Sequence, residues 1–226
     1  MKVHATPNNC LSLDKPMIDK SPGLAKAASN RGQKAELVCR ARGASDITFS
    51  WQKEGQQLAT PTQLATSSKY SVAAAKTDPL TWESRLAIEN VGSQDYGEYK
   101  CVAGNVMGLD EHLVLLNVKS QPDPPQDLQV VNVTYNSVFL TWQPGFNGGF
   151  PQSYRVRMKK AGSEHHFTVE VRPPDATVFQ VQDLQMGSRY SFAVMAFNEM
   201  GESEYTTTSV LATTASKYTV IEKVKV

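Results

Sequence analysis

Apolar and polar residues alternate along several short segments in the first half of the chain. A period of two is typical of β-strands that bury one face and expose the other. Residues 16–19 are expected to form a first edge strand, because Pro22 and Gly23 interrupt the pattern soon after it. The positions expected to face a core are Ala35, Leu37, Cys39, Ile47, Phe49, Trp51, Trp82, Ser84, Leu86, Ile88, Tyr99, Cys101, Ala103, Val114, Leu116 and Val118.

Three prolines within residues 120–125 interrupt this pattern about halfway along the chain. Proline fixes φ, so the segment is predicted to be a short, stiff linker. The alternation then resumes, and residues 206–213 are expected to form the last strand. The positions expected to face a second core include Leu128, Val130, Val138, Leu140, Trp142, Tyr154, Val156, Met158, Tyr190, Phe192, Val194 and Ala196. The predicted fold class is therefore all-β, with two consecutive modules.

Residues 95–101 carry a motif in which two side chains share one face of a strand. Tyr99 and Cys101 are two residues apart, and a tyrosine in this place at the start of a strand is typical of a tyrosine corner. With Cys39 and Trp51 upstream, the pattern resembles that of an I-type immunoglobulin domain. The resemblance implies a β-sandwich whose two sheets are joined by a disulfide between Cys39 and Cys101, covered by Trp51.

The second half resembles a fibronectin type III domain. Trp142 lies on its second strand, Leu184 precedes Tyr190 by six residues, and the sequence Ala-Phe-Asn-Glu-Met-Gly follows. The resemblance implies a second β-sandwich without a disulfide. It also implies that the Tyr190 hydroxyl bonds to backbone upstream of it.

The two resemblances set the expected domain boundaries. Residues 16–119 form the immunoglobulin-like domain, and residues 126–214 form the fibronectin type III domain. Residues 1–15 are expected to be a linker or the tail of a preceding module, residues 120–125 a linker, and residues 215–226 a tail or the start of a next segment.

One stretch narrows the resemblance further. The glycine-rich sequence of residues 142–152 is similar to the corresponding turn of nephrin-type adhesion proteins, a group that includes Sticks-and-stones, Hibris and Echinoid of insects. In those families, a row of immunoglobulin domains ends in fibronectin modules beside the membrane. The resemblance therefore implies an adhesion receptor.

Composition and motifs argue against several function classes. The net charge of +1 gives no general attraction to nucleic acid or to an anionic membrane. The sequence contains no Gly-x-Ser-x-Gly elbow and no phosphate-binding loop. Glu111-His112 has no second histidine at helical spacing, and His165 and His166, adjacent on a strand, face opposite ways. We therefore expect no enzyme activity, no cofactor and no metal.

Three cysteines leave one over when Cys39 and Cys101 pair. That bond would be worth on the order of 4 kcal/mol and persists only in an oxidising compartment. Cys10 is expected either to pair with a cysteine outside this segment or to be a free thiol. Asn132 begins the single Asn-x-Ser/Thr sequon, and the expected secretion makes it a predicted glycosylation site.

Two outward-facing surfaces are candidates for partner contact. Alternation turns Val102, Leu113 and Leu115 outward on adjacent strands, and a contiguous apolar patch can mark an interface. The alternatives are a β-bulge near Gly108, which would turn both leucines inward, and burial against an adjacent module.

The second candidate is a basic row. Arg155, Arg157 and Lys159 share the outer face of one strand and could contact heparan sulphate or an acidic partner. The competing interpretation is a charged outer face that keeps the sheet soluble and discourages edge pairing.

We infer an ectodomain fragment of a single-pass cell-surface adhesion or recognition receptor. Its partners would be other immunoglobulin-superfamily proteins, of the same or a different kind. The start of the chain lacks a signal-peptide core, so a leader and membrane anchor are expected elsewhere in a longer chain. Three alternatives stay open: a complete cytosolic protein, an intracellular array of muscle type, and the outer part of a receptor tyrosine phosphatase or kinase.

Overall fold

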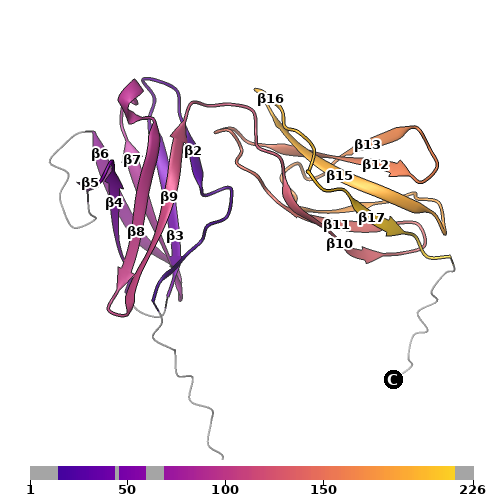
Figure 1. Cartoon of the computed structure of the whole chain (residues 1–226), viewed down its shortest axis with the longest axis horizontal. Coiled ribbons are helices and arrows are strands. Elements are labelled where there is room, and N and C mark those ends of the chain that lie inside the picture. Colours follow the sequence, from indigo (N-terminus) through magenta and orange to yellow (C-terminus); the bar gives the residue numbers. More distant parts are fainter. Residues whose placement is uncertain (1–14, 44–45, 60–68, 217–226) are drawn as a thin grey trace, which may run out of the picture. The chain divides into compact units, whose positions relative to one another are not determined.

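The computed structural model describes residues 15–43, 46–59 and 69–216. The chain divides into two compact units, with the division between Val118 and Lys119. Each unit is a pair of β-sheets, as Figure 1 shows. The all-β fold class of two consecutive sandwiches is confirmed. The predicted features of residues 1–14, Cys10 included, lie outside the described residues.

The first unit packs a four-stranded sheet against a five-stranded one. The four-stranded sheet has the order β1 (Met17–Ile18), β3 (Ala35–Arg42), β7 (Thr81–Ile88) and β6 (Tyr70–Asp78). The five-stranded sheet has the order β2 (Lys26–Ala28), β9 (Gly108–Asn117), β8 (Gly97–Asn105), β4 (Thr48–Lys53) and β5 (Gln56–Ala59). Neighbouring strands are antiparallel except β2 and β9, which are parallel. A short 3-10 turn, η1 (Ser93–Asp95), precedes β8.

The core of the first unit surrounds a disulfide between Cys39 and Cys101. Trp51 is fully buried beside it, and its indole N–H donates to the Ser84 hydroxyl at 3.0 Å. This bond satisfies the one polar group that the tryptophan brings into the core. Among the predicted core positions, Val118 is wrong: its side chain is 54% exposed, because β9 ends at Asn117 and the alternation stops there.

A hydrogen-bond network fixes the tyrosine corner. The Tyr99 hydroxyl donates to the backbone carbonyl of Asp95 at 2.6 Å. Burial alone would raise the pKa of the Asp95 carboxyl, but hydrogen bonds from Lys69, the Gly92 N–H and Tyr70 together lower it. The buried carboxylate therefore ties the segment before β8 to the start of β6.

The second unit packs a three-stranded sheet against a five-stranded one. The first sheet has the order β10 (Gln126–Val133), β11 (Val138–Gln143) and β14 (Val178–Val181). In the second, β13 (His166–Glu170), β12 (Ser153–Lys160) and β15 (Arg189–Asn198) are neighbours. Both β16 (Gly201–Glu202) and β17 (Val210–Thr213) pair with the far side of β15.

Aromatic side chains fill the second core. Trp142 and Tyr154 contact edge to face, with ring centroids 5.4 Å apart. Leu184 is buried, and the Tyr190 hydroxyl accepts a hydrogen bond from the Gln185 backbone N–H at 3.0 Å. The expected bond from this tyrosine to upstream backbone is thus confirmed, and no cysteine lies in this unit.

The proline-containing segment before β10 is attached to the second unit. We call residues 119–125 the strap. Backbone N–H groups of Ser120 and Asp123 donate to the carbonyls of Gly148 and Phe146 at 2.9 and 2.8 Å. The Asn198 amide donates to the Ser120 carbonyl, also at 2.9 Å. The segment predicted as a linker is therefore held to the glycine-rich turn after β11.

Glycine is required where the strap crosses this turn. A Cβ on Gly148, which has a φ of +70°, would lie 2.0 Å from the Ser120 carbonyl oxygen. A Cβ on Gly145 would lie 2.6 Å from the carbonyl oxygen of Asp123. Only residues without a side chain let the two backbone segments approach this closely.

Candidate interaction surface

The strand pair β8 and β9 presents apolar side chains outward from the five-stranded sheet of the first unit. Pairing runs without a register shift from Gly97 opposite Leu116 to Asn105 opposite Gly108. Val114 and Leu116 are fully buried, so Leu113 and Leu115 point to the outer face. No bulge turns these leucines inward. Leu113 is 48% exposed, while Leu115 is half-buried.

Four residues on this face, two from each strand, form the corners of a rectangle, which we call the quartet. Val102 lies opposite Glu111, and Lys100 lies opposite Leu113. The apolar pair Val102 and Leu113 therefore occupies one diagonal, and the charged pair occupies the other. Lys100 Nζ is 3.3 Å from Glu111 Oε2, and both side chains are substantially exposed.

The apolar surface extends beyond the three residues expected from the sequence. Leu109 lies opposite Gly104 on the same outer face and is 62% exposed. Val106 and Met107, in the turn that joins β8 to β9, are also exposed. Sequence analysis missed Leu109, although it continues the odd-numbered alternation of Leu113 and Leu115 by two further steps.

The basic row on β12 is largely engaged within the second unit. Arg155 bonds to Glu202 at 2.8 Å and lies 3.8 Å from Glu170. Its guanidinium also sits over the Phe197 ring, at 5.1 Å from the centroid. Arg157 stacks 3.9 Å from the Tyr205 ring centroid.

Lys159 completes the row and lies between Ser191 on β15 and His166 on β13. An acidic ligand would therefore compete with two carboxylates for Arg155 and with an aromatic ring for Arg157. This arrangement favours a structural use of the two arginines.

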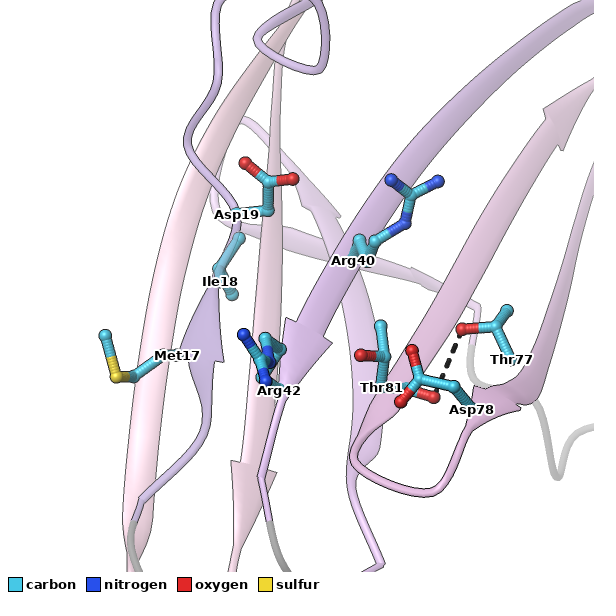
Figure 2. A pocket seen from close by; sticks show the side chains of 8 residues that line it. All are labelled: Met17, Ile18, Asp19, Arg40, Arg42, Thr77, Asp78 and Thr81. Carbon is cyan, nitrogen blue, oxygen red and sulfur yellow. Dashed lines mark hydrogen bonds between the residues drawn. The ribbon is translucent and has the colours of Figure 1, made fainter. Parts of the chain in front are cut away.

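A surface hollow of about 560 Å³ lies on the four-stranded sheet of the first unit. Figure 2 shows Arg40 and Arg42 on one strand, with Asp19 and Asp78 to either side. Arg40 bonds to Glu83 at 2.7 Å. A hydrogen bond from the Leu80 N–H lowers the pKa of Asp78, and the charge of Arg42 acts in the same direction. The hollow thus contains charges of both signs, and most of them already interact with other groups of the protein. It therefore offers no distinctive binding chemistry.

The predicted glycosylation site lies on β10. Asn132 is exposed, and its side-chain oxygen accepts from the Val133 N–H at 2.8 Å. Thr134 of the sequon accepts a hydrogen bond from the Ser137 backbone N–H at 2.9 Å. The Asn132 side chain is therefore accessible for a glycan.

Within residues 15–43, 46–59 and 69–216, no group of three or more His, Cys, Asp or Glu side chains could hold a metal ion. The same ranges contain no helix with the length and apolar character needed to cross a membrane.

Comparison with known families assigns both units. The immunoglobulin I-set family matches residues 16–118, and the fibronectin type III family matches residues 123–211. The chain joins one domain of each family. It is 37% identical to human nephrin over 191 residues, which cover 83% of this chain and 15% of nephrin. It is 31% identical to the Drosophila melanogaster cell adhesion molecule Dscam2 over 177 residues, covering 76% of this chain and 8% of Dscam2.

One of these relatives, Dscam2, is named as a cell adhesion molecule, and the chain spans only a small part of the length of either relative. The nephrin-like character expected from the glycine-rich turn is confirmed. The strap explains why this turn is rich in glycine, because the strap is held against the turn by hydrogen bonds and leaves no room for side chains there.

Proposed function

We propose that this chain is part of the ectodomain of a cell-surface adhesion receptor and that the outer face of β8 and β9 binds another immunoglobulin-superfamily protein. The uninterrupted register of these strands carries the proposal. It aligns Leu109, Leu113 and Leu115 on one face, with Val102 beside them. Exposed apolar residues gathered on one face are typical of protein–protein interfaces.

The disulfide supports an extracellular location. A bond between Cys39 and Cys101 persists in an oxidising compartment, which favours the extracellular side of the plasma membrane over a cytosolic muscle-type array. The similarity to a protein named as a cell adhesion molecule supports the same location. A glycan at Asn132 would be compatible with it.

The test places two negative charges on the proposed face. The Leu113→Asp, Leu115→Asp double variant should stay folded with only a modest fall in melting temperature, since Leu113 is 48% exposed and Leu115 is half-buried. Tetramers of the wild-type chain would be applied to cells that each display one immunoglobulin-superfamily ectodomain, this chain included. The double variant should lose binding to every cell line that the wild type recognises.

The matched control is Leu211→Asp, which changes an exposed leucine on β17 of the second unit. This variant should bind as the wild type does. If the double variant also binds normally, or if the wild type recognises no cell line in the panel, the proposed function is wrong. If the double variant fails to fold, the single Leu113→Asp variant, at the more exposed position, repeats the comparison.

A further inference from the structure

The quartet has a symmetry that bears on which protein would bind. Its apolar residues, Val102 and Leu113, lie on one diagonal, and Lys100 and Glu111 lie on the other. When two identical sheets face each other across a two-fold axis, each position meets its mirror image across the line of that axis. If the two-fold axis lies parallel to the sheet and directly above the apolar diagonal, the position of Lys100 in one copy faces the position of Glu111 in the other.

From this geometry we infer that the partner of the β8–β9 face is a second copy of this chain, an inference that rests on the proposed function. In such a dimer, Val102 meets Val102 and Leu113 meets Leu113. Each Lys100 meets Glu111 of the second copy, so the interface contains two equivalent ion pairs. A single surface thus supplies both the apolar contact and its own complementary charges.

The contacts that Lys100 and Glu111 make within one copy leave them able to pair with the second copy. The ion pair between Lys100 and Glu111 is exposed within one copy, and exposed pairs contribute little to stability. The next strand contributes Ser50 opposite Val102 and Gln52 opposite Lys100, both uncharged. Lys26, opposite Leu115, lies where the apolar diagonal extends onto β2. The two Lys26 residues would therefore meet near the axis, where their long side chains would have to turn away from each other.

Charge exchange tests the inference directly. Within the quartet, Lys100→Glu gives two glutamates, and Glu111→Lys gives two lysines. Each variant alone places two like-charge contacts in the symmetric dimer and should weaken self-association by on the order of tenfold or more. An equimolar mixture of the two variants restores both ion pairs, so it should form a heterodimer about as strong as the wild-type dimer.

Sedimentation equilibrium of the wild type, of each variant and of the mixture measures these associations. Lys159→Glu on the second unit is the control for a general charge effect and should leave self-association unchanged. A melting curve for each variant verifies that the first unit is folded.

Three results would overturn the inference: a wild-type chain that stays monomeric up to roughly 100 µM, variants that associate normally, or a mixture that remains monomeric. These outcomes are separate from failure of the proposed function. If Leu113→Asp, Leu115→Asp loses binding to a different displayed protein while the wild type is monomeric, the face is an interface but the second copy is not its partner.

Discussion

At the scale of single residues, His112 is poorly matched to its surroundings. It lies opposite Cys101 on β9, and its Nε2 is buried without a hydrogen-bond partner among the described residues. Burial lowers its pKa, and the charge of Lys20 lowers it further. Asp110 and Asp19 act in the opposite direction without reversing the shift.

Because the folded-state pKa is below the unfolded value of about 6.5, the unfolded chain binds the proton more readily. Stability of the first unit should therefore be complete above this value and decline as the pH falls below it. Urea denaturation at pH 7.5, 6.5 and 5.5 measures the decline. His112→Gln should flatten it over this range, whereas His166→Gln, at an exposed position of the second unit, should not. An unchanged slope in His112→Gln would contradict the assignment.

The residues that could be predicted from sequence are those whose roles depend on local spacing. Tyr99 and Cys101 are two apart, and Leu184 precedes Tyr190 by six, so both corners could be identified without a structure. The pairing of Lys100 with Glu111 could not, because it depends on how two strands align. For the same reason, alternation placed Leu113 outward but could not show Val102 on its diagonal.

At the scale of elements, strands with one buried face were the predictable ones. The strand β6 was not predicted, because beyond Tyr70 and Val72 nearly all its side chains are exposed and no alternation in hydrophobicity remains. The parallel strand β2 is too short to show a period. The segment that contains the strap was expected to be a short, stiff linker. Its hydrogen bonds to the turn after β11 could not be predicted, because they join residues too distant in sequence for any local pattern to reveal.

The strap gives a prediction for the second unit. Gly148→Ala would place a Cβ against the Ser120 carbonyl oxygen and should lower the free energy of unfolding. Gly162→Ala is the matched control, because Gly162 has a similar φ of +78° with no atom within 4 Å of the added carbon. The control carries only the conformational cost, about 1–2 kcal/mol, and Gly148→Ala should exceed it by about 2 kcal/mol.

Hydrogen exchange locates the effect. Amides of Ser120 and Asp123 should lose protection in Gly148→Ala and keep it in Gly162→Ala. Equal destabilisation by the two substitutions would show that the close approach of the strap contributes nothing.

At the scale of the whole molecule, the two units should respond differently to reduction. The disulfide between Cys39 and Cys101 spans 62 residues, and its loss removes on the order of 4 kcal/mol from the first unit. Calorimetry should show two transitions, of which a reductant lowers only one. The Cys39→Ala, Cys101→Ala double variant identifies that transition.

In the oxidised, denatured chain, a thiol reagent should modify Cys10 at most. Two or more reactive thiols per chain would contradict the extracellular assignment.

The strap also bears on how such proteins diversify. If domains of this kind are exchanged as units, the proline-rich stretch between the two cores is where the chain would be expected to divide. The residues that hold this stretch in place, however, lie downstream in the sequence and include Gly145, Gly148 and Asn198. A rearrangement that gave the second domain a new upstream neighbour would have to carry residues 119–125 with it. The heritable unit thus begins before its first strand.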